Sequence, residues 1–72
     1  MELLLFRTDI KSKKKVKYLQ PLLNEHAGVL DWSIDLEDID NVLRIEASAQ
    51  SIEEDIIGLV QKQGFYIKTL AD

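Results

Sequence analysis

Along this chain the pattern of hydrophobic and polar positions switches between the spacing typical of a strand and the spacing typical of a helix. These switches predict six elements. An apolar run over residues 2–7 is typical of a strand buried on both faces in the middle of a sheet. Residues 13–25 follow with apolar side chains three and four positions apart, which predicts an amphipathic helix. Ser12 is its predicted N-cap, Gly28 marks its predicted end, and Pro21 is expected to kink or split it.

A regular alternation of apolar and polar residues over 30–37 predicts a second strand with one buried face. Trp32 belongs to its apolar set and is expected in the core. Residues 38–41 have turn chemistry, and alternation over 43–48 predicts the returning strand of a hairpin. The expected exposed face of this hairpin consists of Asp31, Ser33, Asp35, Arg44 and Glu46.

The C-terminal part of the chain predicts another helix and a last strand. Ser51 and Glu54 have the spacing of a capping box, Gly64 ends the helix, and residues 65–70 form a short strand. The six elements predict one α+β domain over residues 1–72 with the ferredoxin-like βαββαβ order. Right-handed crossovers fold this order into a four-stranded antiparallel sheet with both helices on one face.

This topology places three connections at the same end of the domain. They are residues 8–12 before the first helix, residues 37–41 at the hairpin tip, and the Gly64-Phe65 turn. A cluster of lysines, Lys11, Lys13, Lys14, Lys15 and Lys17, lies at this end, beside the acidic hairpin tip. Positive charge at a helix start opposes the helix dipole. The cluster therefore either binds an anionic or acidic partner, or is a solvated face paired with the hairpin.

Composition narrows the chemistry of the chain. It has 72 residues, a net charge of −4 and no cysteine, so disulfides, thiolate metal sites and thiol catalysis are excluded. The net charge argues against nucleic acid as a partner. The apolar run near the N-terminus is too short for a signal or a membrane span, so we expect a cytoplasmic protein without membrane contact. We also expect a monomer.

Several spacings match one family of small domains. They are carried by Leu19 and Leu23 in the first helix, by Gly28-Val29 before the second strand, and by Gly64-Phe65 before the last. With these residues nearly the whole chain resembles a heavy-metal-associated domain, the module of small copper chaperones and of the tails of metal-pumping ATPases.

The resemblance aligns the metal-binding loop of that family, Met-Thr-Cys-x-x-Cys, with residues 10–15. Ile10 takes the methionine position, which packs under the loop in the family. Ser12 and Lys15 take the two cysteine positions, and Phe65 matches the aromatic residue beside the metal loop. Cu(I) is bound by two soft thiolates, whereas serine is a hard, neutral ligand and a lysine ammonium repels metal. The resemblance therefore implies no metal or other cofactor at this loop.

The favoured interpretation is a non-enzymatic interaction module that docks an acidic protein surface. Two alternatives remain open: a metal-handling protein that uses oxygen ligands or the thiols of a partner, and a module that holds a small anion at the start of the helix. The residues assigned to partner or anion binding are Lys11, Ser12, Lys13, Lys14, Lys15 and Phe65.

Other kinds of site find little support in the sequence. No window has the ligand spacing of a calcium-binding EF-hand. The single histidine, His26, is expected at the end of the first helix, where a cation suits the dipole. A Ser12–Lys15 catalytic dyad would need a desolvated lysine in a cleft, which neighbouring lysines oppose. No catalytic residue is predicted.

Overall fold

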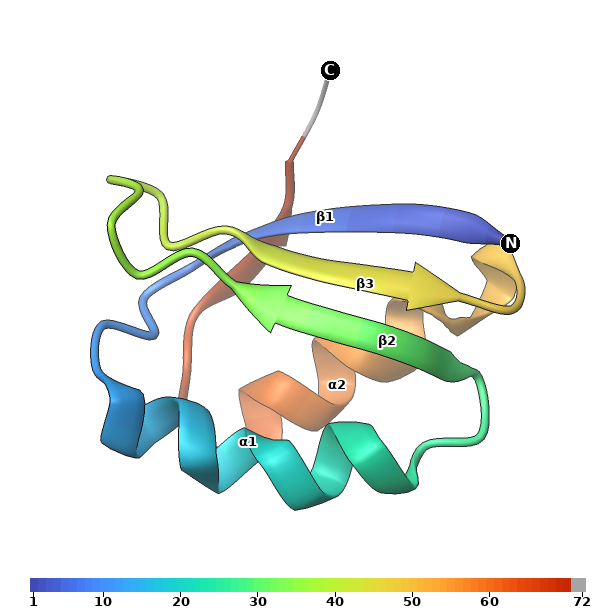
Figure 1. Cartoon of the computed structure of the whole chain (residues 1–72), viewed down its shortest axis with the longest axis horizontal. Helices are drawn as coiled ribbons and strands as arrows, with labels where there is room; N and C mark the ends of the chain where they lie inside the picture. Colours follow the sequence, from blue (N-terminus) through green and yellow to red (C-terminus); the bar gives the residue numbers. More distant parts are fainter. Residues whose placement is uncertain (71–72) are drawn as a thin grey trace.

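A computed structural model describes residues 1–70 and has the predicted α+β architecture. Its four strands lie side by side in the order β2-β3-β1-β4, and every neighbouring pair is antiparallel. Both helices lie on one side of this sheet (Figure 1). The elements are β1 (Glu2–Thr8), α1 (Lys13–Glu25), β2 (Val29–Ile34), β3 (Leu43–Ala47), α2 (Glu53–Lys62) and β4 (Ile67–Thr69). This element order and strand order confirm the ferredoxin-like prediction.

The central position of β1 explains why its sequence is apolar throughout. Phe6 lies opposite Leu43 of β3 on one side and opposite Thr69 of β4 on the other. The alternate residues Leu4 and Phe6 are buried under the helices, while Leu3 lies on the uncovered face of the sheet. The prediction of a strand in the middle of the sheet is confirmed.

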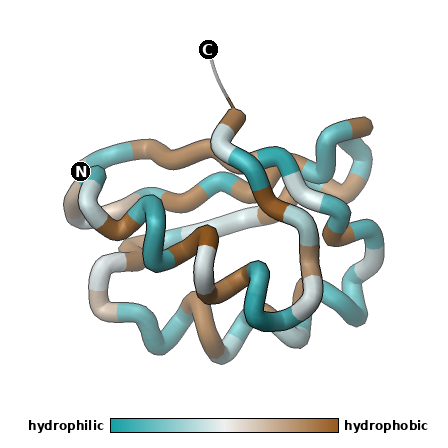
Figure 2. Tube along the Cα trace, turned by 180° about the vertical axis from the view of Figure 1, so that it is seen from behind, coloured by the Kyte–Doolittle hydropathy of each residue, from teal (hydrophilic) through white to brown (hydrophobic). Residues whose placement is uncertain are grey.

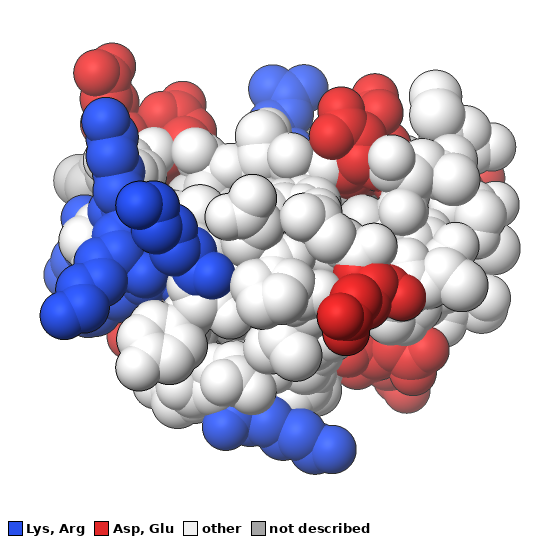
Figure 3. All heavy atoms as spheres, turned by 60° about the horizontal axis from the view of Figure 1, so that its bottom comes forward, with Lys and Arg blue, Asp and Glu red and all other residues white. Residues whose placement is uncertain are grey.

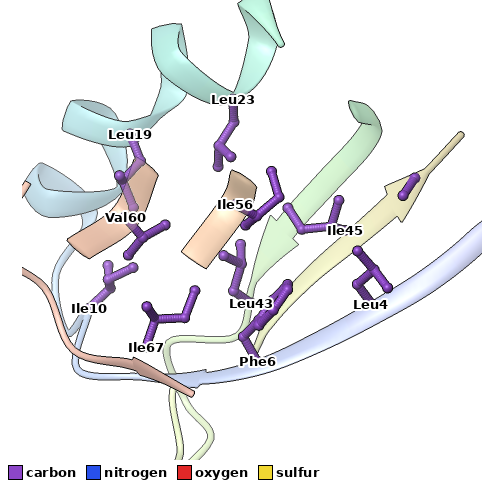
Figure 4. Close-up of a cluster of buried hydrophobic side chains, with 11 residues drawn as sticks. Leu4, Phe6, Ile10, Leu19, Leu23, Leu43, Ile45, Ile56, Val60 and Ile67 are labelled. Atoms are coloured by element: carbon purple, nitrogen blue, oxygen red, sulfur yellow. The ribbon is translucent and has the colours of Figure 1, made fainter. Parts of the chain in front are cut away.

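One hydrophobic core fills the space between the sheet and the helices. The labelled side chains in Figure 4 point toward one another from β1, β3, β4, both helices and the loop before α1. Leu19 and Leu23 of α1 and Ile56 and Val60 of α2 have no exposed surface. The three- and four-residue spacings that predicted amphipathic helices are therefore the spacings that place these side chains on the sheet.

The first helix has the bounds expected from the sequence, 13–25. Ser12 has an extended backbone, and its Oγ accepts a hydrogen bond from the Lys15 amide at 3.2 Å, which confirms it as the N-cap. Pro21 was expected to kink or split the helix; it does not split it, because α1 is continuous through it. Pro21 is exposed, and so is Lys17, whose carbonyl oxygen loses its helical donor to the proline.

The second strand departs from the predicted alternation at its first residues. The register of β2 against β3 shifts between Val29 and Asp31, and such a bulge puts an extra residue on one face. Leu30 is consequently 56% exposed and lies outside the core in which the alternation placed it. Trp32 is only half-buried, and its indole Nε1 donates a 2.8 Å hydrogen bond to Asn24 Oδ1.

The capping box predicted for the second helix is wrong. A 3-10 turn over Gln50–Ile52 leads directly into α2, so Ser51 lies inside a turn and not at an extended N-cap. No side chain caps α2. Glu53 instead accepts hydrogen bonds from Gln50 Nε2 at 2.8 Å and from Thr69 Oγ1 at 3.1 Å. The first contact joins α2 to the preceding turn, and the second ties the start of α2 to β4.

The last two elements end close to their predicted positions. The second helix stops at Lys62, and Gly64 follows in the left-handed region with φ of 88°, which suits a residue without a Cβ. The final strand is shorter than expected, since only Ile67–Thr69 pairs with β1.

Gly28 lies in the connection from α1 to β2, against the residue that precedes α2, and a side chain there would collide with its neighbours. A Cβ on Gly28 would lie 2.8 Å from Ile52 Cγ2 and 3.3 Å from His26 Cε1. We expect Gly28→Ala to lower the free energy of unfolding by about 1–3 kcal/mol, since a branched side chain must shift to make room. Urea unfolding followed by circular dichroism measures this change.

Gly58 offers the matched control, because a Cβ there meets no atom within 4 Å. It lies inside α2, where alanine is favoured over glycine by about 0.5–1 kcal/mol. Gly58→Ala is therefore expected to raise stability. Equal effects of the two substitutions would contradict the close approach at Gly28.

Candidate functional site

The three connections predicted to share one end of the domain do lie together. The Thr8 amide donates to the Asp40 carbonyl at 3.0 Å, and Thr8 Oγ1 donates to the Asn41 carbonyl at 2.6 Å. The Tyr66 amide donates to Asp9 Oδ1 at 2.8 Å. The loop before α1 is thus fastened on one side to the hairpin and on the other to the segment after Gly64.

The hairpin tip is held in one conformation by its own polar residues. Asn41 is buried with a positive φ of 44°, a conformation that asparagine tolerates. Its backbone amide donates a hydrogen bond to the Asp38 carbonyl at 3.0 Å. Asp35 Oδ1 accepts from the amides of Glu37 and Asp38, and Asp38 Oδ1 accepts from the Asp40 amide. The aspartates of the hairpin therefore build the turn as well as supplying charge.

The lysine cluster lies at this end, on the first turns of α1 and the loop before it. Figure 3 shows the largest group of Lys and Arg side chains gathered at one end of the molecule. All five of these lysines are exposed. Within residues 1–70 none of them lies within 4 Å of a carboxylate oxygen, and the ion pair at this end joins Arg7 Nε to Asp40 Oδ1 at 3.1 Å. Pairing of the cluster with the acidic hairpin, the other interpretation of the sequence, is absent from this part of the chain.

The remaining predicted site residues have different environments. Ser12 is half-buried, and its oxygen serves as the N-cap acceptor. Phe65 is half-buried and packs against the core, so only part of its ring is accessible. Ile10, in the same loop as Ser12, is completely buried in the core. The lysines are thus the accessible part of the predicted set.

Exposed apolar side chains accompany the lysines, and the sequence reasoning did not single them out. Figure 2 shows a hydrophobic position at the outer end of the β2–β3 loop, and Ile39 in that loop is 94% exposed. Tyr18, one turn after Lys14 and Lys15, is 65% exposed, and Tyr66 is 49% exposed. An apolar residue between turn-forming aspartates was the signal that could have identified Ile39 beforehand.

Thr8 and Asn41 were also missed, although they position the loop. Thr8 follows Leu4 and Phe6 at the inward-facing positions of β1, and it is a polar residue in an apolar series. A buried hydroxyl needs a hydrogen-bond partner, and that requirement was the available signal. It identifies a polar contact but not its partner, which lies 33 residues away.

Metal-ligating side chains do not converge in the described residues. Within residues 1–70 no group of three or more His, Cys, Asp or Glu side chains could hold an ion. His26 is the C-terminal cap of α1, as expected. Its Nδ1 accepts the Gly28 amide at 3.0 Å, and its Nε2 lies 3.7 Å from Asp55 Oδ2.

Neither described helix has the length and hydrophobicity of a membrane span. Comparisons with protein-family models, with curated proteins and with solved structures found no match. Any inference about function therefore rests on the site itself.

Proposed function

We propose that this domain is a non-enzymatic interaction module that docks an acidic protein surface. The docking surface is the end formed by residues 8–17, 37–41 and 64–65. In this proposal the domain is a metal-chaperone-like fold in which Ser12 and Lys15 have replaced the two metal-binding cysteines. The proposal includes a cytoplasmic location, consistent with a small chain that lacks the cysteines on which secreted domains of this size commonly rely.

The observation that carries the proposal is the exposed, unpaired state of the lysine cluster. Five ammonium groups project from one helix start, and within residues 1–70 no carboxylate lies within 4 Å of any of them. These charges do not stabilise the helix, since its N-terminal end already carries partial positive charge. A fixed cluster of one sign attracts and orients a partner of the opposite sign.

The exposed apolar side chains at the same end support a protein as the partner. Tyrosine and isoleucine side chains supply contact area that excludes water from neighbouring polar pairs. Tyr18 lies next to the lysines on α1, and Ile39 projects from the hairpin. An interface that combines apolar contacts with a charged rim is the usual arrangement between proteins.

The test replaces Lys13, Lys14 and Lys15 together by glutamine. We expect the free energy of unfolding to change by less than about 1 kcal/mol, because exposed charges contribute little to stability and these three oppose the dipole of α1. Association with an acidic partner protein, isolated by cross-linking to the wild-type domain, should slow by about tenfold at low salt. The difference should shrink as salt rises.

The matched control removes three positive charges elsewhere, through Arg44→Gln, Lys62→Gln and Lys68→Gln. Its net charge equals that of the lysine variant. The comparison therefore shows whether the position of the lost charges matters or only their number. Association at the wild-type rate by the control, with slow association by the lysine variant, supports the proposal. Equal rates for the two variants would refute it, as would a large loss of stability in the lysine variant.

A further inference from the structure

The face of the sheet that the helices leave uncovered holds a cavity beside the β2–β3 loop. In Figure 1 this loop and the C-terminal end of the described chain both rise on the side of the sheet away from the helices. The cavity is a depression wide open to solvent, with a volume of about 600 Å³, which falls in the range of small-molecule sites. It lies on a different face from α1 and is separate from the lysine cluster.

Arg44 supplies the positive charge of this cavity. It lies on β3, opposite Ser33 of β2 and Leu5 of β1, and it points away from the helices because its neighbours Leu43 and Ile45 are buried. Within residues 1–70 its guanidinium forms no ion pair, in contrast to Arg7, which binds Asp40. A guanidinium in this state can bind a carboxylate through two parallel hydrogen bonds.

Two carboxylates of the hairpin line the same cavity, those of Asp35 and Asp38. Asp35 Oδ1 accepts the amides of Glu37 and Asp38 at 3.1 and 3.2 Å, and Asp38 Oδ1 accepts the Asp40 amide at 2.8 Å. These bonds hold the side chains in place. The Oδ2 atom of each accepts no hydrogen bond from residues 1–70 and is available to a donor from outside the chain.

The rest of the cavity wall is mainly apolar. Leu5 and Leu70 lie side by side, since the Leu70 amide donates to the Leu5 carbonyl at 3.0 Å and so continues the pairing of β4 with β1. Val42 adds a third apolar side chain from the hairpin. We call Leu5, Val42 and Leu70 the apolar lining.

We propose that this cavity binds a small zwitterion with an apolar body, of the class of apolar α-amino acids. The carboxylate of the ligand pairs with Arg44, and its ammonium group lies at the oxygens of Asp35 and Asp38. The apolar body rests on the apolar lining. Arg44, the two aspartates and the apolar lining surround one cavity, and they match the three parts of such a ligand, whose carboxylate, ammonium group and apolar side chain are all attached to one carbon.

The test is a nuclear magnetic resonance titration of the nitrogen-labelled domain with leucine. Leucinamide, which lacks the carboxylate, and N-acetyl-leucine, which lacks the ammonium group, are the comparison probes. Because the ligand is small, we expect a dissociation constant on the order of 1 mM for leucine. Its shifts should map to Ser33, Asp35, Arg44 and the apolar lining, and both comparison probes should bind more weakly.

Two substitutions assign the roles. Arg44→Gln is expected to weaken the binding of leucine about tenfold, the effect of one charge-assisted hydrogen bond. The affinity for leucinamide should stay unchanged. Asp35→Asn keeps the Oδ1 acceptor of the turn and removes the charge. It should therefore weaken the binding of leucine and of leucinamide but not the binding of N-acetyl-leucine. Lys68→Gln removes a positive charge from β4, outside the cavity, and should have no effect on any probe.

The proposal is overturned by an absence of shifts with leucine, by shifts that map away from the cavity, or by equal binding of leucine and leucinamide. The variant with Lys13, Lys14 and Lys15 changed to glutamine should bind leucine like the wild type. Failure of the cavity proposal therefore leaves the docking proposal standing, and failure of the docking proposal leaves the cavity proposal standing.

Discussion

Phe6→Ala is expected to lower the free energy of unfolding by about 3–5 kcal/mol. The side chain has no exposed surface and lies on the central strand, between the residues of β3 and β4 that pair with it. Its removal leaves a cavity that the sheet cannot close, because backbone hydrogen bonds hold the strands at their spacing. For a chain of 72 residues the total stability is roughly 4–11 kcal/mol, so this single substitution should remove a large share of it.

The control for this prediction is Phe6→Leu, which keeps most of the apolar volume. We expect it to cost about 1–2 kcal/mol. Guanidinium unfolding of the two variants, with the slope of the transition unchanged for Phe6→Leu, measures the difference. A loss below about 1 kcal/mol for Phe6→Ala would mean that this side chain is not at the centre of the core.

Thr8→Val is expected to lower the free energy of unfolding by about 1–3 kcal/mol and to loosen the proposed docking surface. Valine has nearly the shape of threonine but cannot form the two hydrogen bonds of the buried hydroxyl. Thr8 Oγ1 donates to the Asn41 carbonyl at 2.6 Å and accepts the Ile10 amide at 3.2 Å. Both backbone groups then remain buried without a hydrogen-bond partner. Because burying an unpaired polar group is costly, the substitution should lower stability.

Amide hydrogen exchange distinguishes this effect from a simple loss of packing. In Thr8→Val the Ile10 amide should exchange much faster, and protection should also fall at the Asn41 amide in the hairpin. Thr8→Ser keeps the hydroxyl and loses one methyl group, at about 1 kcal/mol, so it should lower stability without increasing exchange at Ile10 relative to its neighbours. Equal exchange at Ile10 in the two variants would show that the hydroxyl does not hold the loop.

Local features of the fold could be predicted because their physical causes are local. The bounds of α1 and its cap follow from spacings within one helix and from a serine that satisfies an amide three residues later. The central position of β1 follows from apolar residues on both of its faces. The common end of the three loops follows from element order alone, since right-handed crossovers leave few arrangements.

Predictions failed where a distant part of the chain altered a local preference. The capping box at Ser51 was locally sound, but residues 50–52 form a 3-10 turn in place of the extended cap, and Glu53 after this turn accepts a hydrogen bond from Thr69 of β4. Leu30 fits the alternation of its strand, but a register shift against β3 turns it to solvent. In both cases the partner lies on another element, and period and propensity carry no information about it.

The candidate site shows the same division between local and distant causes. The sequence by itself determined the lysine cluster, its place at a helix start and its proximity to the hairpin, because these depend on composition and element order. Only the tertiary structure decided that the acidic hairpin pairs with Arg7 in place of the lysines, and that Thr8 fastens the loop to Asn41. It also gathered Arg44, Asp35 and the apolar lining around one cavity. Side chains from different strands meet there through register, and register is fixed by packing of the whole sheet.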